Sequence, residues 1–310
     1  MGKRACVFPG QGSQAVGMGK DLAAAFPEAL KVFEQADGAL GESLSLMCFE
    51  GPEEQLRLTA NTQPAILTVS LAVHGVLANR GATWDGVAGH SLGEYSAIGA
   101  AGGLSVADLV RTVRRRGELM QEAVPVGVGA MAAVLGPDRT VVEAACREAS
   151  TDSEAVVPAN FNSPEQTVIA GHAGAVARAG ALLSERGAKR VVPLPVSAPF
   201  HSPLMVPARE GLAPVLDALP FADLAVPLYN NVDAKPVQRA DEVRSGLVRQ
   251  VDAPVRWVEL VRHMVADGFD TFVEVGPGGV LSNLIRRIDR SVSTVAVGTV
   301  EQVESYLSTL

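Results

Sequence analysis

The chain has 310 residues, of which 47% are hydrophobic and 19% are charged, and it contains 31 glycines and 19 prolines. This composition is typical of a globular enzyme of one or two domains and excludes a disordered or low-complexity chain. The formal net charge of -8 argues against broad binding of nucleic acid, because such binding needs a basic face that neutralises phosphates.

The cysteines and the apolar segments indicate a cytoplasmic protein. Cys6, Cys48 and Cys146 are odd in number and widely spaced, which favours neither a disulfide framework nor a CxxC metal site. The apolar stretch near the N-terminus is too short for a signal peptide, and the longest apolar segment, 65–78, falls short of a bilayer span. We therefore expect a cytoplasmic location, no membrane partner and no metal.

The first predicted element is a buried strand at 5–8 that enters a glycine-rich loop. The loop Gly10-Gln11-Gly12-Ser13-Gln14-Ala15 formally fits the dinucleotide fingerprint, and Glu34 or Asp37 lies at a suitable distance for a ribose contact. Alternatively, the glycines form a strand-to-helix turn whose backbone N–H groups face a cleft. We favour the second interpretation, because the motif alone is weak.

Farther along, an apolar helix is predicted at 65–80 and a short strand at 84–88. The strand leads into Gly89-His90-Ser91-Leu92-Gly93, and a capping pattern at Ser105 predicts a helix that runs to about Glu122. The order of strand, sharp turn and helix is the context in which a G-x-S-x-G motif forms a nucleophile elbow. Ser91 is therefore the candidate nucleophile.

A different pattern fills the middle of the chain. Strands are expected at 130–135, 156–161, 166–170 and 190–195, and helices at 138–149 and 173–186. The resulting β-α-β-β-α-β order is that of a ferredoxin-like unit. We expect an α/β fold in which this small domain, 127–196, is inserted into a large domain made of 1–126 and 197–310.

The last part of the chain returns to the α/β pattern, with apolar runs at 226–229 and 271–275. The second run enters Gly276-Pro277-Gly278-Gly279, which lacks the Gly-Lys-Ser/Thr ending of a phosphate-binding P-loop. We interpret it as a structural strand-to-helix turn near the floor of the cleft.

A serine nucleophile needs a base within hydrogen-bond reach, which contributes roughly 10²- to 10⁴-fold in rate. Of the five histidines, His74 is expected in the core, His172 in a turn, His263 on a helix surface and His90 beneath the elbow. His201 remains, in a loop that prolines on both sides hold stiffly. An ordinary loop histidine is the alternative.

With these residues in view, the sequence resembles the malonyl-CoA:acyl carrier protein transacylases over nearly its whole length. The motifs are specific in combination. They are Phe8-Pro9-Gly10-Gln11-Gly12-Ser13-Gln14, Gly89-His90-Ser91-Leu92-Gly93-Glu94-Tyr95-Ser96, Arg116-Gly117, Asn160-Phe161-Asn162-Ser163-Pro164, Phe200-His201-Ser202, Tyr229-Asn230-Asn231 and Glu274-Val275-Gly276-Pro277-Gly278.

The resemblance implies a hydrolase-like large domain and a ping-pong reaction without a metal or a permanently bound cofactor. Ser91 would attack the thioester of malonyl-CoA while His201 takes its proton. The phosphopantetheine thiol of acyl carrier protein would then receive the malonyl group from the serine. Backbone N–H groups of Gln11 and Leu92 would form the oxyanion hole.

The resemblance also implies roles for other residues. Arg116 would pair with the free carboxylate of the substrate, while its neighbours Arg114 and Arg115 face outward. Orientation of His201 would come from a backbone carbonyl near Gln250 and Asn231 in place of an aspartate. Phe200 and Leu92 accompany malonyl selection, and the substrate-binding set includes Phe200, Asn160 and Asn162.

The expected partner is the acyl carrier protein of fatty acid or polyketide biosynthesis. A local basic surface for that acidic protein would come from Arg114, Arg115, Lys189, Arg190, Arg286 and Arg287. Three alternatives remain open at this point: a malonyl transferase of a malonate decarboxylase system, a hydrolase or editing enzyme for acyl thioesters, and a non-catalytic module that docks carrier proteins. A general hydrolase would gain little from a buried cation such as Arg116.

Overall fold

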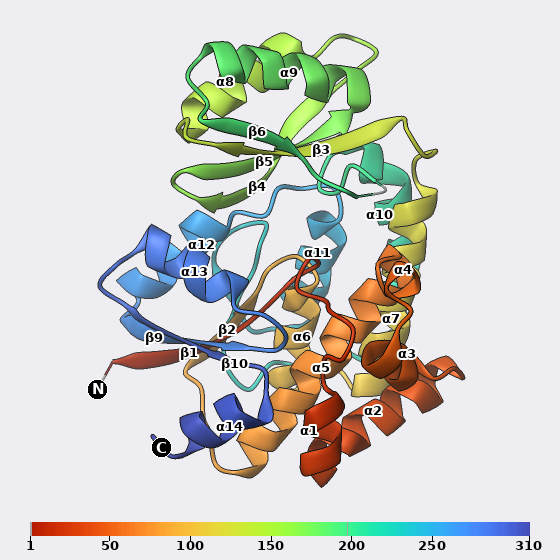
Figure 1. Cartoon of the computed structure of the whole chain (residues 1–310), viewed down its shortest axis with the longest axis vertical. Helices are drawn as coiled ribbons and strands as arrows, with labels where there is room; N and C mark the ends of the chain where they lie inside the picture. The colour runs from red at the N-terminus through yellow and green to blue at the C-terminus, as the bar shows by residue number, and fades with distance from the viewer. Residues whose placement is uncertain (1, 197) are drawn as a thin grey trace.

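Two β-sheets lie one above the other in the computed structural model, which describes residues 2–196 and 198–310 (Figure 1). The larger sheet has the strand order β10-β9-β1-β2-β7-β8. Its neighbours pair in parallel, except that β8 is antiparallel to β7. Its strands are β1 (Lys3–Phe8), β2 (Gly86–Gly89), β7 (Leu228–Tyr229), β8 (Pro236–Val237), β9 (Phe269–Val275) and β10 (Ser293–Val297).

Strand β1 is buried on both faces, as its continuous apolar run predicts. Cys6 and Phe8 pack into one hydrophobic cluster, and Ala5 and Val7 pack into another, because successive side chains of a strand point to opposite faces. The first cluster involves most of the large-domain helices: α1 (Lys20–Ala25), α2 (Pro27–Leu40), α3 (Leu44–Glu50), α4 (Glu53–Leu56), α5 (Thr59–Asn79), α6 (Gly93–Ala100), α7 (Val106–Glu122), α10 (Val206–Asp217), α11 (Ala240–Gln250) and α14 (Val300–Leu307). The second involves α12 (Trp257–Ala266) and α13 (Val280–Ile288).

Most predicted boundaries differ from the observed ones by one or two residues, and two of the differences have a structural reason. Helix α5 begins at Thr59 instead of 65 and contains Pro64, although proline favours the first helical turn. Burial of Thr62 and Gln63 in the core accompanies this earlier start. Strand β7 has two residues instead of the four predicted at 226–229, because only Leu228 and Tyr229 pair with β2.

The smaller sheet has the order β4-β5-β3-β6, and all its neighbours are antiparallel. Helices α8 (Arg139–Ala149) and α9 (Ala173–Glu185) cover one face through a separate apolar cluster. The strands are β3 (Gly129–Leu135), β4 (Val156–Ser163), β5 (Gln166–His172) and β6 (Arg190–Pro193). The order confirms the predicted ferredoxin-like unit and the α/β fold class. Its limits at 127 and 196 stay a prediction, and Ser197 lies outside the described residues.

The parallel strands bring distant segments to one edge of the large sheet. The loops after β1, β2 and β7 all leave at the carboxyl ends of neighbouring strands, where α/β sheets form their crevices. The four-stranded sheet stands over this edge in Figure 1, and the isolated bridge between Asn160 and Val255 joins the two parts. Of the helices in the described residues, none combines the length and the hydropathy of a membrane crossing.

The packing of α7 on α5 generates a stability prediction. A Cβ at Gly117 would lie 2.7 Å from the Cα of Ala60 and 2.8 Å from the carbonyl oxygen of Thr59, so the two helices would have to separate. We expect Gly117→Ala to lower the free energy of unfolding by about 1–3 kcal/mol.

The matched control is Gly38→Ala in α2, where the added Cβ meets nothing within 4 Å. It should raise stability by about 0.5–1 kcal/mol, since alanine restricts the unfolded chain more than glycine does. Chemical denaturation of both variants measures the two effects, and equal changes would contradict the predicted packing.

Candidate active site

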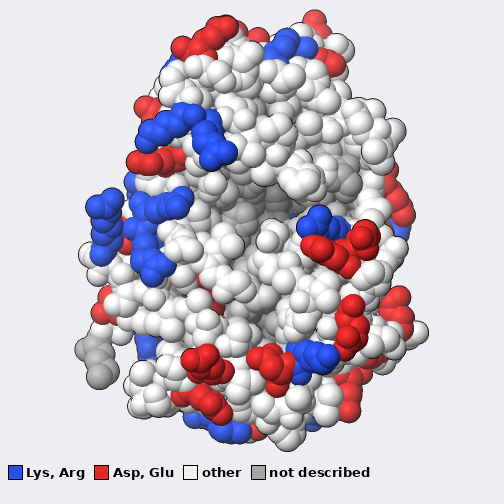
Figure 2. Space-filling view, viewed as in Figure 1, with Lys and Arg blue, Asp and Glu red and all other residues white. Residues whose placement is uncertain are grey.

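A cavity of about 120 Å³ lies at the carboxyl edge of the large sheet and contains most of the predicted site residues. Figure 2 shows the surface hollowed between the upper and lower parts of the molecule. The predicted residues that line the cavity are Gln11, Ser91, Leu92, Arg116, Asn160, Phe200 and His201. They come from segments separated by up to 190 positions in the chain, since Gln11 and His201 are the outermost of them.

Ser91 lies in a sharp turn between β2 and α6. Its φ of 52° is in the left-handed region, which a serine rarely occupies and which costs on the order of 1–3 kcal/mol. The turn needs both flanking glycines: a Cβ at Gly89 would lie 2.0 Å from the backbone of Gly93, and one at Gly93 would lie 2.0 Å from the carbonyl oxygen of Phe8. The G-x-S-x-G motif therefore forms the nucleophile elbow that its spacing predicts.

Asn231 holds this turn from the neighbouring strand. Its Oδ1 accepts a hydrogen bond from the backbone N–H of Ser91 at 2.7 Å, and its Nδ2 donates to the carbonyl oxygen of Gly89 at 2.7 Å. The structure thus places the Asn231 side chain on the serine turn, whereas the sequence suggested contact with His201. The reason is topological, because Asn231 follows β7, which pairs directly with β2.

His201 faces Ser91 from the proline-flanked loop before the short 3-10 helix η1 (Pro203–Met205). Its Nε2 lies 2.7 Å from Ser91 Oγ, and its Nδ1 lies 2.9 Å from the carbonyl oxygen of Gln250 and 3.1 Å from that of Ala253. Two carbonyl acceptors place the ring hydrogen on Nδ1 and leave the Nε2 lone pair toward the serine hydroxyl. The backbone carbonyl of Gln250 therefore lies where it can orient the ring.

Burial and the nearby Arg116 guanidinium lower the pKa of His201 from 6.5 to about 3. The imidazole is therefore neutral at neutral pH and can accept a proton. His201 itself has a positive φ of 57°, so both members of the pair have strained backbones. Such strain persists only where the surrounding structure holds the residue firmly.

Arg116 brings a buried cation to the same cavity. Its side chain is only 1% exposed, and burial lowers its pKa. Its guanidinium donates to Gln63 Oε1 at 2.8 Å, to Gln250 Oε1 at 3.0 Å and to Ser91 Oγ at 3.2 Å. Among the described residues no carboxylate lies within 4.0 Å of it, in contrast to Arg114 and Arg115, which pair with acidic side chains. Arg116 is therefore suited to bind an anion that enters the cavity.

Backbone donors also face the cavity. Gln11 follows β1 and Leu92 follows Ser91 at the start of α6, and both line the cavity. Within residues 2–196 and 198–310, no acceptor takes either backbone N–H. A carbonyl oxygen that becomes negatively charged near Ser91 can accept hydrogen bonds from both N–H groups. Together these groups can support a nucleophilic attack on an acyl carbonyl.

The predicted position of His90 is wrong. Instead of packing beneath the elbow, it lines the cavity, and its Nε2 lies 2.8 Å from the Oδ1 of Asn162 on β4. Asn162 therefore faces His90, whereas Asn160 lines the cavity directly. The reason is that β4 reaches down to the elbow, a contact between two sheets that no local pattern contains. His74, His172 and His263 do not line this cavity.

Two buried polar residues of the site had no predicted role. Gln63 accepts a hydrogen bond from Arg116, and Glu94 accepts from the side chain of Gln250. A signal for Glu94 was present, because a carboxylate in the apolar segment 93–100 is unusual and needs a partner. Gln63 had no such signal, since it precedes an apolar run that is typical of a buried core helix.

The glycine loop does not form a dinucleotide site. After β1 the chain makes turns as far as Gly19, and α1 begins only at Lys20, so no helix N-terminus follows the motif directly. Asp37, one of the two candidate ribose ligands, instead accepts hydrogen bonds from Ser45. The structure supports the alternative, a turn whose backbone faces the cleft.

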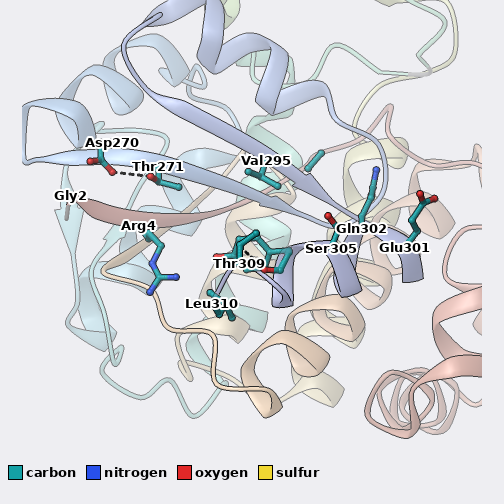
Figure 3. A pocket seen from close by; sticks show the side chains of 12 residues that line it. Gly2, Arg4, Asp270, Thr271, Val295, Glu301, Gln302, Ser305, Thr309 and Leu310 are labelled. Atoms are coloured by element: carbon teal, nitrogen blue, oxygen red, sulfur yellow. Dashed lines mark hydrogen bonds between the residues drawn. The ribbon is translucent and has the colours of Figure 1, made fainter.

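A larger concavity, of about 830 Å³, lies beside the edge strand β10 and helix α14 (Figure 3). Its charged lining residues are Arg4, Asp270 and Glu301. Arg4 and Asp270 stand near the amino ends of β1 and β9, away from the loops that carry Ser91 and Gln11. No pair of nucleophile and base occurs among its described lining residues, so the smaller cavity is the candidate active site.

Comparison with known proteins gives one consistent result. The family model described as acyl transferase domain matches residues 5–304. The malonyl CoA-acyl carrier protein transacylase of Bacillus subtilis is 47% identical over 310 residues, which cover 100% of this chain and 98% of the relative. That of Escherichia coli K12 is 49% identical over 294 residues, covering 94% of this chain and 95% of the relative.

A solved structure extends the comparison to three dimensions. It holds a type II PKS acyl-carrier protein in complex with its malonyl-transacylase, and it superposes with a TM-score of 0.97 at 45% identity, covering 99% of this chain and 100% of that one. Both the sequence and the fold therefore match over essentially the full length. The chain belongs to the acyl transferase family that contains the malonyl CoA-acyl carrier protein transacylases.

Proposed function

We propose that this chain transfers the malonyl group from malonyl-CoA to the phosphopantetheine thiol of an acyl carrier protein, for fatty acid or polyketide biosynthesis. The observation that carries the proposal is a single cavity in which a serine–histidine pair, 2.7 Å apart, lies next to a buried guanidinium without a carboxylate partner among the described residues. The names of the relatives support the same substrates.

In the proposed first half-reaction, Ser91 Oγ attacks the thioester carbonyl while His201 Nε2 takes its proton. The resulting oxyanion accepts hydrogen bonds from the backbone N–H groups of Gln11 and Leu92. Each of these hydrogen bonds contributes on the order of 10²- to 10³-fold in rate. The thioester C–S bond then breaks, and His201 returns the proton to the leaving thiolate of CoA. The product of this half-reaction is a malonyl ester on Ser91.

The second half-reaction reverses these roles. His201 accepts the proton of the phosphopantetheine thiol as its sulfur attacks the ester, and the ester oxygen of Ser91 recovers a proton when it leaves. Only side chains, backbone donors and the two thiols take part, so the proposed cycle uses no metal and no resident cofactor. The buried free cysteines Cys6, Cys48 and Cys146 suit the reducing cytoplasm in which we place the reaction.

Arg116 is proposed to bind the free carboxylate of the malonyl group, with Phe200 and Asn160 lining the rest of the acyl pocket. Asn162 is proposed to act less directly, through its contact with His90. This arrangement favours a transferase for carboxylated acyl groups over a general thioester hydrolase, because a buried cation is costly unless the substrate uses it.

The proposed carrier protein is acidic, and Figure 2 shows Lys and Arg side chains gathered on the left edge of the molecule, where Figure 1 places α13. Arg286 and Arg287 on α13 are exposed, as are Lys189 and Arg190 at the start of β6. The relative whose structure holds a carrier protein supports such a partner. Arg114 is a weaker candidate for this surface, because it is partly buried and paired with Glu42.

The covalent step gives the first test of this function. We expect intact-protein mass spectrometry after mixing with malonyl-CoA to show a malonyl adduct on the wild type and none on Ser91→Ala. The control Ser96→Ala removes a buried hydroxyl on α6, the helix that follows the Ser91 turn, and should keep the adduct. Transfer of the adduct to holo acyl carrier protein supports the proposal, whereas loss to water at the same rate with or without carrier would make the protein a hydrolase.

Acyl selectivity tests the proposed role of Arg116. We expect Arg116→Ala to slow malonylation of Ser91 by about 30-fold or more, because a buried charge pair with the substrate is lost. Acetylation from acetyl-CoA, which lacks the free carboxylate, should change much less. The exposed neighbour Arg115→Ala is the matched control and should leave both rates unchanged. Equal losses with both acyl groups would argue against a carboxylate contact.

The protonation of His201 can be observed directly. Because its pKa is lowered to about 3, the ring should stay neutral down to about pH 4, with its hydrogen on Nδ1. Imidazole ¹⁵N NMR between pH 5 and 8, assigned with His201→Ala, should show no titration of this ring. A midpoint near the ordinary value of 6.5 would contradict the buried, neutral base.

A further inference from the structure

Glu94 is a buried carboxylate on α6, three positions after Ser91, and it is fully inaccessible to solvent. It does not line the cavity, so it lies behind the reacting groups. Its Oε2 accepts two hydrogen bonds, from the backbone N–H of Asn231 at 2.9 Å and from Gln250 Nε2 at 2.9 Å. Its Oε1 has no partner among the described residues. Burying such a group is costly, which calls for a reason.

The two partners of Glu94 hold the backbone of Ser91 from both sides. Asn231 Oδ1 accepts from the N–H of Ser91 at 2.7 Å, and Gln250 Nε2 donates to its carbonyl oxygen at 3.0 Å. The main chain of Gln250 also accepts from His201 Nδ1. One carboxylate oxygen therefore connects the loop after β7 with the end of α11, the two segments that fix the strained serine and the histidine.

Glu94 also carries a charge opposite to that of Arg116, and the side-chain amide of Gln250 lies between the two groups. Gln250 Oε1 accepts from Arg116 Nη2 at 3.0 Å, and its Nε2 donates to Glu94. Burial raises the pKa of Glu94 to about 7, although the hydrogen bonds from Gln250 and Asn231 and the nearby Arg116 guanidinium lower it. A carboxylate bound by Arg116 in the cavity would place a second negative charge near the same cation. Glu94 would then compete electrostatically with the substrate for Arg116.

We propose that Glu94 is a positioning residue that fixes the Ser91 turn through Asn231 and Gln250 and whose charge weakens the hold of Arg116 on the acyl carboxylate. The role rests on the proposed function, because the charge effect requires a carboxylated acyl group. A moderate hold on the substrate favours turnover, since binding energy that is equal in the ground state and the transition state does not accelerate the chemical step.

Two substitutions separate the positioning role of Glu94 from the effect of its charge. Glu94→Gln keeps the length but removes the charge, and it leaves either an amide N–H without an acceptor or an amide facing two donors. Glu94→Asp keeps the charge but shortens the reach to Asn231 and Gln250. Single-turnover malonylation of Ser91 is followed by quenched mass spectrometry at about pH 8, where a carboxyl with a pKa of about 7 is mostly ionised. A range of malonyl-CoA concentrations gives the maximal rate and the half-saturating concentration. Acetyl-CoA serves as the acyl donor without a free carboxylate.

We expect both variants to lower the maximal rate by about 10- to 100-fold with either donor, because the serine turn is no longer held in place. The half-saturating concentration of malonyl-CoA should fall by about 3- to 10-fold in Glu94→Gln alone, since only this variant removes the competing charge. That of acetyl-CoA should not change. Glu118→Gln, a surface carboxylate on α7 that pairs with Arg115, is the matched control and should behave as the wild type.

Three results would overturn the inference. Folded variants with wild-type rates and half-saturation would show that Glu94 does not position the site. A rise of half-saturation with both donors would indicate general loosening of the pocket instead of a charge effect. If circular dichroism shows that Glu94→Gln does not fold, a wild-type rate in folded Glu94→Asp would overturn the positioning role. A wild type that forms no malonyl adduct would overturn the proposed function as well, so the two failures are distinguishable.

Discussion

The left-handed backbone of Ser91 is the constraint around which the site is organised. A serine keeps a φ of 52° only when surrounding contacts stabilise this strained conformation. Here Gly89 and Gly93 make room for the tight turn, and side chains from two other segments take the N–H and carbonyl groups of the serine. The strain has a chemical result, because it directs the hydroxyl out of the turn, to a position 2.7 Å from His201 Nε2.

Neighbouring parallel strands explain why these segments meet. β1, β2 and β7 end at the same edge of the sheet, so the residues that follow them are adjacent even though they are far apart in the chain. The small domain covers this edge and contributes Asn160 from β4, while α7 and α11 bring Arg116 and Gln250 from the side. The resulting cavity is small, and the Arg116 and His201 side chains beside it are almost completely buried, which strengthens their electrostatic interactions.

Buried charge is costly, and this site contains both a buried guanidinium and a buried carboxylate. Gln250 joins them through its two amide ends, so neither Arg116 nor Glu94 is isolated from opposite charge. Replacing such groups by apolar ones often increases stability, so their presence is explained better by function than by folding. A cation without a direct carboxylate partner is available for a substrate, and the amide keeps the opposing carboxylate one residue away.

The sequence by itself determined the elements with strong local signals: the buried strand β1, the helix that Ser105 caps, the four strands and two helices of the small domain, and the serine turn with its glycines. Periodicity and turn chemistry depend on residues that are close in the chain, so they can be recognised from the sequence alone. The tertiary structure decided what depends on neighbours across the sheets: Asn231 on the serine turn, His90 against Asn162, and Glu94 behind Gln250. These contacts arise from strand pairing and domain docking between distant segments, and no short pattern encodes such distances.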